Sequence, residues 1–100
     1  MFSLLDASCD GQFEYGVAYP GNDLNNGKEH RRETPEQCQE LCKETPRCFG
    51  WTWGASGDHC WVKHTLGNKR EGVEGRVSGK KNSCNGEYFI KTIKIFHNLL

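Results

Sequence analysis

The chain has 100 residues, six of which are cysteines, and only 35% of its residues are apolar. Its 13 basic and 13 acidic residues give a formal net charge of zero, which argues against a nucleic-acid partner and against a charged membrane surface. The length allows one domain, and a domain this small and polar needs disulfides or a metal to supplement its core. An even number of cysteines in a short chain favours a disulfide framework and an oxidising compartment.

The N-terminal segment, residues 1–8, lacks the features of a secretory signal. Its apolar run is short, no basic residues precede it, and Asp6 follows at once. No stretch of the sequence is long and apolar enough to insert into a membrane. We therefore expect residues 1–8 to be a leader outside the domain, and the chain to be a fragment of a larger secreted or cell-surface protein.

The first half of the sequence predicts a strand, a turn and a loop. Aromatic and β-branched residues occupy alternate positions in residues 13–19, which is the pattern of a β-strand. Residues 20–23, with the sequence Pro-Gly-Asn-Asp, are typical of a turn, and residues 25–33 are polar and charged.

The strongest local signal is a helix start. Thr34 can cap a helix, Pro35 suits its first position, and Gln37 completes a capping box. We expect a helix from Pro35 to Glu44, because the residue before Pro46 avoids the helical conformation.

The second half predicts mainly β-structure. Residues 48–53 and 60–65 both have strand patterns, and the turn-forming residues 54–58 between them predict a hairpin. Residues 73–78 form a weaker strand candidate. Residues 88–96 are apolar and β-prone and can add an edge strand to the sheet, but we expect the tail, residues 85–100, to lie outside the core.

Six cysteines allow 15 connectivities, and the predicted elements reduce that number. Cys38 and Cys42 lie one turn apart on one face of the helix, so each can reach a different strand. Cys42 is joined to Cys48 by a short link, and Cys38, one turn earlier, would meet the next strand at Cys60. Cys9 and Cys84 are the two cysteines that remain. The predicted pairs are therefore Cys9–Cys84, Cys38–Cys60 and Cys42–Cys48.

A zinc site is the alternative use of these residues. Cys38-x3-Cys42 followed by His59-x4-His64 loosely resembles a two-Cys, two-His finger. The segment between the cysteine pair and the histidine pair is longer than the usual length of about 12 residues. It also contains a predicted strand where a finger needs a helix. Zinc would leave four cysteines unexplained, whereas disulfides use all six. We therefore expect neither a metal nor another cofactor.

In this order and spacing, five segments between Cys9 and Cys84 resemble the PAN/apple domain family. The segments are residues 19–24 (YPGNDL), 34–42 (TPEQCQELC), 48–53 (CFGWTW), 60–63 (CWVK) and 77–79 (VSG). The resemblance implies a small α+β, disulfide-rich domain over residues 9–84, with an antiparallel β-sheet curled around a single α-helix. It also implies that the cysteines pair first with sixth, second with fifth and third with fourth, in agreement with the pairs above.

The resemblance implies a binding function. Family members are adhesion and recognition modules of extracellular proteins, and any catalytic domain lies elsewhere in the chain. We expect protein–protein recognition, with a carbohydrate-binding module of the same fold and a zinc-binding intracellular domain as alternatives. The sequence contains no Gly-x-Ser-x-Gly elbow, phosphate-cradling glycine loop or His-Glu-x-x-His motif, and every cysteine is assigned to a bridge, so we expect no enzyme.

One candidate binding site lies on the second strand of the hairpin. If Cys60 points at the helix, alternation places Trp61 and Lys63 on the other face. An outward tryptophan beside a lysine is typical of binding hot spots and of sites that stack on sugar rings. The alternative is that a loop or the tail covers Trp61.

A second candidate site is basic. His30, Arg31 and Arg32 lie in one charged loop, Lys69 and Arg70 lie in another, and Lys80 and Lys81 follow later in the chain. Together they can attract an acidic or heparin-like partner, although solvated loops have the same composition.

Overall fold

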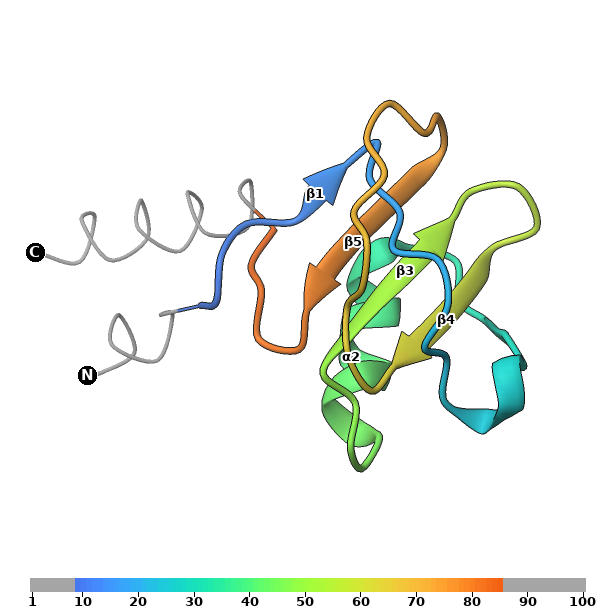
Figure 1. Cartoon of the computed structure of the whole chain (residues 1–100), viewed down its shortest axis with the longest axis vertical. Coiled ribbons are helices and arrows are strands. Elements are labelled where there is room, and N and C mark those ends of the chain that lie inside the picture. Colours follow the sequence, from blue (N-terminus) through green and yellow to red (C-terminus); the bar gives the residue numbers. More distant parts are fainter. Residues whose placement is uncertain (1–8, 86–100) are drawn as a thin grey trace, which may run out of the picture.

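The computed structural model describes residues 9–85, which form a five-stranded antiparallel sheet with one α-helix against one face (Figure 1). The strand order across the sheet is β1-β5-β3-β4-β2. The elements are β1 (Glu14–Tyr15), the 3-10 turn η1 (Asn25–Gly27), β2 (His30–Arg31), α2 (Pro35–Glu44), β3 (Gly50–Gly54), β4 (His59–Lys63) and β5 (Arg76–Lys80). The predicted fold class is confirmed. The predicted leader, and the predicted tail beyond its first residue, lie outside the described residues.

Helix α2 has the predicted bounds. The hydroxyl of Thr34 accepts a hydrogen bond from the backbone N–H of Gln37 at 3.1 Å, which satisfies one free donor of the first turn. The side-chain oxygen of Gln37 accepts from the backbone N–H of Glu33 at 2.8 Å, so the reciprocal bond forms one residue earlier than in a standard capping box. Thr45, before Pro46, has extended φ and ψ angles of −94° and 119°, which end the helix.

Trp51 on β3 is the centre of the core. It is fully buried and lies opposite Val62 on β4 and Gly79 on β5. The Phe13 ring meets it edge to face, with ring centroids 4.9 Å apart. A Cβ atom at Gly79 would lie 2.7 Å from the Trp51 ring, so the indole requires a glycine there.

A buried hydrogen-bond network ties α2 to this core. The side-chain oxygen of Gln39 accepts from the indole N–H of Trp51 and from the hydroxyl of Ser83, both at 2.9 Å. Its amide nitrogen donates to the backbone carbonyl of Ser83. The amide, indole and hydroxyl groups therefore all have partners, as buried polar groups require.

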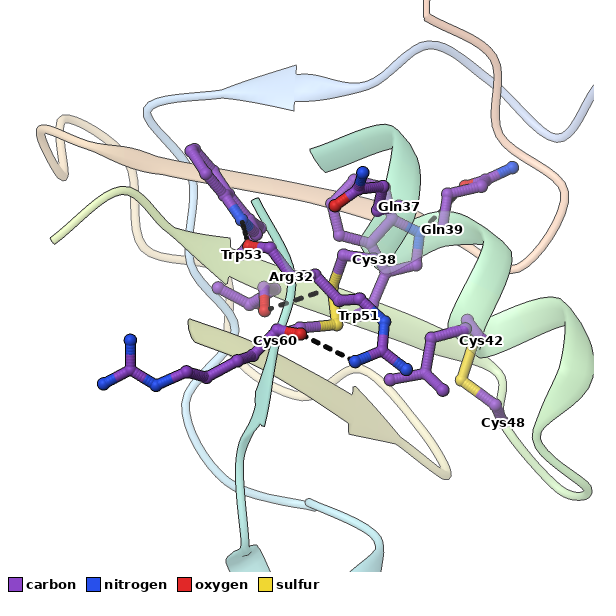
Figure 2. The surroundings of a disulfide bond; sticks show 12 residues. Arg32, Gln37, Cys38, Gln39, Cys42, Cys48, Trp51, Trp53 and Cys60 are labelled. Carbon is purple, nitrogen blue, oxygen red and sulfur yellow. Dashed lines mark hydrogen bonds between the residues drawn. A yellow bond between two sulfur atoms is a disulfide. The ribbon is translucent and has the colours of Figure 1, made fainter. Parts of the chain in front are cut away.

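Three disulfides join the framework in the nested arrangement expected from the sequence. The pairs are Cys9–Cys84, Cys38–Cys60 and Cys42–Cys48, with Cα atoms 5.4 to 5.7 Å apart. Figure 2 shows the second pair between α2 and β4 and the third between the last turn of α2 and Cys48. The first pair joins the two ends of the described chain.

The predicted strand over residues 13–19 is shorter in the structure. Within residues 13–19, only the two residues of β1 pair with β5. Gly16 then adopts a φ of 75° and turns the chain out of the sheet. The chain then crosses to the face away from α2, where the carbonyl of Val17 accepts from the buried hydroxyl of Ser78 at 2.7 Å. Period-2 alternation alone cannot detect such a crossing.

The remaining strands differ from prediction mainly in their limits. The hairpin is present as β3 and β4, whereas β5 begins later than residue 73 because Gly75 has a φ of 77° and prolongs the turn before it. The sequence reasoning missed β2, which pairs with β4, and η1. Both lie in the segment predicted to be a polar loop.

Candidate functional site

The sheet face away from α2 carries two long segments of chain. Alternation along the strands places Thr52, Trp61 and Arg76 on this face. Residues 16–24 and residues 64–75 cross in front of β3 and β4 in Figure 1, whereas α2 lies behind them. This face is therefore built from segments that are distant in sequence.

Backbone hydrogen bonds hold the two crossing segments together. Ala18 and Arg70 exchange both of their backbone hydrogen bonds, at 2.9 and 2.8 Å. The first segment is also fixed to β4, since the backbone N–H of Leu24 donates to the carbonyl of Val62 at 2.8 Å. The segments thus form walls on a rigid sheet.

A pocket of about 290 Å³ opens between these walls, and we call it the sheet-face pocket. Its lining residues come from the first crossing segment, the sheet and the second crossing segment: Ala18, Tyr19, Pro20, Gly21, Asp23, Thr52, Trp61, Lys63, Arg76, Arg70 and Val73. It is a candidate ligand site within residues 9–85 because it combines aromatic, aliphatic and cationic groups.

Lys63 lies on the predicted face and is buried there. Its exposed fraction is 3% because residues 20–23 fold over it. The ammonium group donates to the carbonyl of Gly21 at 3.0 Å and forms an ion pair with the carboxylate of Asp23. The lysine therefore anchors one wall of the pocket and has its charge already paired.

Trp61 is partly buried and is flanked by two side chains. The His59 ring lies 5.3 Å from the indole, between centroids, and the Arg76 guanidinium lies over the indole, 5.5 Å from its centroid. Gly54 lies on the strand between them, and a Cβ there would be 3.0 Å from Nη1 of Arg76 and 3.3 Å from the Trp61 ring. The missing side chain at Gly54 thus lets Arg76 reach across β3.

Arg31 and Arg32 do not line the sheet-face pocket. Arg31 is exposed on the edge strand β2, opposite His59. Arg32 lies near the Cys38–Cys60 disulfide in Figure 2, where its carbonyl accepts from the indole N–H of Trp53 at 2.8 Å. The guanidinium of Arg32 donates to the carbonyl of Arg31 at 2.6 Å. The pocket therefore includes Arg70 from the second basic loop, but neither arginine of the first.

Sequence reasoning missed two residues of the pocket. The sequence does not predict the role of Arg76, because it does not say that residues 73–78 pair with β3 and bring Arg76 beside Gly54. Tyr19 was assigned to a strand, although it belongs to a wall of the pocket. Arg70 was noted only as part of a basic loop, and nothing local in the sequence indicates that this loop crosses the sheet.

The rim of the pocket is held by a charged cluster. The Tyr19 hydroxyl donates to the Glu14 carboxylate at 2.6 Å, and the Lys69 ammonium lies 2.9 Å from the other carboxylate oxygen. Burial and the hydrogen bond to Glu14 raise the pKa of the Tyr19 phenol far above its usual range. Burial by itself would raise the pKa of Glu14, but the hydrogen bonds from Tyr19 and Lys69 and the charge of Lys69 outweigh it and lower that pKa.

The zinc alternative is wrong because Cys38 and Cys42 are both oxidised in disulfides and cannot act as thiolate ligands. Over residues 9–85, the structure contains no group of three His, Cys, Asp or Glu side chains placed to hold a metal ion. Within the same range, every helix is too short or too polar to cross a membrane.

Comparisons with known proteins agree with the fold described above. A family described as the PAN domain matches residues 17–63. The solution structure of the two N-terminal apple domains of Toxoplasma gondii microneme protein 4 is 29% identical, with a TM-score of 0.56 over 74% of this chain and 45% of that chain. This chain therefore spans less than half of that two-domain structure.

A PAN module from Eimeria tenella shares the fold, with 24% identity, a TM-score of 0.55, and coverage of 77% of this chain and 83% of that chain. No curated protein matches the sequence. The family match, the two structural likenesses and the three nested disulfides agree on one assignment. The chain therefore resembles the PAN/apple family, in its fold and, over residues 17–63, in its sequence, and the homologous PAN/apple modules are non-catalytic binding domains.

Proposed function

We propose that this chain is a recognition module of a secreted or cell-surface protein and that it binds a protein partner through the sheet-face pocket. The observation that carries the proposal is the pocket itself, which places Trp61, Arg70 and Arg76 together on the face that α2 leaves uncovered. Tryptophan and arginine are enriched among the residues that supply most of the binding energy at protein interfaces.

The rigidity of this face supports a recognition role. The Cys38–Cys60 disulfide fixes β4 to α2, and the buried Lys63–Asp23 pair fixes the first crossing segment to β4. A surface that is already ordered loses little conformational entropy when a partner binds, which favours affinity. Three disulfides also support an oxidising extracellular compartment and a folded unit that spans residues 9–84, closed by Cys9–Cys84.

The environment of Trp61 favours a protein partner over a sugar. Stacking of a sugar ring needs an open aromatic face, whereas the Arg76 guanidinium already lies over this indole. A sugar that stacked there would have to displace a cation–π contact. An arginine on an aromatic platform is instead typical of protein interfaces.

A peptide-display selection tests the proposal. The oxidised chain is panned against a random-peptide library, and the enriched peptides are measured by fluorescence anisotropy. Val73→Trp fills the pocket from an irregular segment, and Glu44→Trp places the same side chain on the exposed end of α2 as a matched control. We expect Val73→Trp to weaken binding at least about tenfold, equivalent to about 1.4 kcal/mol, and Glu44→Trp to leave it unchanged.

Equal binding by both variants would contradict the proposed surface. Enrichment of no peptide, together with glycan-array binding that Trp61→Ala abolishes, would replace protein recognition with carbohydrate recognition. Circular dichroism of each variant shows that a loss of binding is not a loss of fold.

A further inference from the structure

The sheet-face pocket has an excess of positive charge. Its lining contains three cationic side chains and one acidic side chain, and that acid, Asp23, is already paired with Lys63. Neither Arg70 nor Arg76 forms an ion pair with any residue of the described range 9–85. The neighbouring Lys69 differs, because it pairs with Glu14 and Glu71. Among residues 9–85, both arginines that line the pocket therefore have no acidic partner, and their charges can attract an external anion.

Arg76 is held in a position that suits a carboxylate. It is partly buried, lies over the Trp61 indole and crosses β3 above Gly54. Stacking on a ring uses the face of the guanidinium and leaves the N–H groups at its edge free to donate. A planar fork of N–H donors matches the two oxygens of a carboxylate. Partial burial makes such a hydrogen bond stronger than the same bond in water.

The rest of the lining suits an amino-acid side chain. Ala18, Pro20 and Val73 are aliphatic, so they can contact the methylene groups that carry a side-chain carboxylate. A volume of about 290 Å³ lies at the lower end of the range for ligand sites and is large enough for such a side chain. An apolar wall beside two free guanidinium groups thus fits an acidic side chain better than a strongly hydrated sugar.

We propose that the sheet-face pocket binds an aspartate or glutamate side chain of the protein partner, with Arg76 as the principal carboxylate-binding residue and Arg70 as the second cation. This inference rests on the proposed function and makes it more specific. It assigns the chemistry of the ligand group that enters the pocket, whereas the proposed function assigns only the surface and the class of partner.

An NMR titration of the ¹⁵N-labelled oxidised chain tests the inference. The probes are N-acetyl-glutamate amide and N-acetyl-glutamine amide, which differ only in the charged group, at up to about 50 mM because one charge-assisted contact gives millimolar affinity. We expect glutamate to shift the side-chain signals of Arg76 (Nε–H) and Trp61 (indole N–H), and glutamine at the same concentration to leave them unchanged.

Matched arginine variants locate the effect. Arg76→Gln removes the principal donor and should weaken the glutamate response at least tenfold, whereas Arg31→Gln removes an exposed arginine outside the pocket and should leave it unchanged. Arg76→Lys keeps the charge without the fork, and we expect it to retain less than half of the affinity of the wild type. The ¹H–¹⁵N spectrum of each variant verifies its fold.

The inference is overturned if glutamate and glutamine produce equal shifts, if Arg31→Gln weakens the response as much as Arg76→Gln, or if neither probe shifts Trp61. A response to glucuronate at lower concentration than to glutamate would assign the pocket to an acidic sugar instead. Neutral display-selected peptides that Val73→Trp excludes would overturn this inference and leave the proposed function standing, so the two failures are distinguishable.

Discussion

The indole nitrogen of Trp51 donates a hydrogen bond to the side-chain oxygen of Gln39 at 2.9 Å, and both side chains are buried. This contact joins the centre of the sheet to the inner face of α2. The same oxygen also accepts from Ser83, so one amide satisfies donors on two other segments of the chain.

Gln39→Leu tests the energetic weight of this network. The leucine has a similar volume, but it leaves the Trp51 N–H and the Ser83 hydroxyl buried without this partner, so we expect the free energy of unfolding to fall by about 2–4 kcal/mol. Urea denaturation followed by tryptophan fluorescence measures the change. Glu44→Ala, on the exposed side of the same helix, is the control and should change stability by less than about 0.5 kcal/mol. A Gln39→Leu protein as stable as the control would contradict this account of the core.

Gly79→Ala tests the close approach of β5 to the same tryptophan. The added Cβ would lie 2.7 Å from the Trp51 ring and 2.4 Å from the Ser83 hydroxyl, so one of them must move. We expect a loss of about 1–3 kcal/mol, as for other overpacked cores, measured by thermal or urea unfolding. Gly67→Ala is the matched control, because its new methyl group meets only the flexible side chain of Asn22. Equal stability of the two alanine variants would show that the core accommodates the methyl group.

The buried Lys63–Asp23 pair gives a third prediction. Lys63→Met removes the ammonium and leaves the Asp23 carboxylate in a site where 21% of its side chain is exposed. We expect a loss of about 2–4 kcal/mol, somewhat below the full cost of an unpaired buried charge because Asp23 retains some solvent. Adding Asp23→Leu should recover part of this loss, since no charge is then left unpaired. A double variant less stable than Lys63→Met alone would refute this explanation.

Tyr19 gives the chain a pH dependence at alkaline pH. Its pKa is raised in the folded state by burial and by the hydrogen bond to Glu14. Above the unfolded value of about 10, the unfolded chain releases the phenolic proton while the folded chain keeps it, so the free energy of unfolding decreases as the pH rises from that point. The contribution is fully present below about pH 10. Urea denaturation at a series of pH values should show a smaller decrease for Tyr19→Phe, and an unchanged decrease would contradict the assignment.

Glu14 contributes with the opposite sign. Because its pKa is lowered in the fold, its contribution is present above about pH 4.5 and is lost as the pH falls through the lowered value. Glu14→Gln should therefore flatten the acid side of the stability profile, and the same series of denaturation curves measures it. A profile that keeps its full acid slope would show that the slope comes from other carboxyl groups.

Local sequence patterns were sufficient to predict much of the fold. Thr34, Pro35 and Gln37 act within one helical turn, so their pattern was sufficient to predict the bounds of α2. The helix period then placed Cys38 and Cys42 on one face, which limited the disulfides that geometry allows. Strand alternation was likewise sufficient to assign Trp61 to the face away from the helix.

The candidate site could not be predicted in the same way because it depends on long-range crossings. Gly16 turns the chain across the sheet, and the hydrogen bonds between Ala18 and Arg70 join segments about 50 residues apart in sequence. The burial of Lys63 follows from this crossing, since alternation assigns a face but does not say what covers it. Arg76 joins the site only because Gly54, on a different strand, has no side chain.

Hydrogen–deuterium exchange of the chain with and without a display-selected peptide tests the central claim most directly, because it locates the bound surface without any substitution. If the sheet-face pocket is the binding surface, the peptide slows exchange in residues 16–24 and 64–75 and leaves α2 unchanged. Slower exchange confined to residues 35–44 would place the partner on the helix and contradict the account.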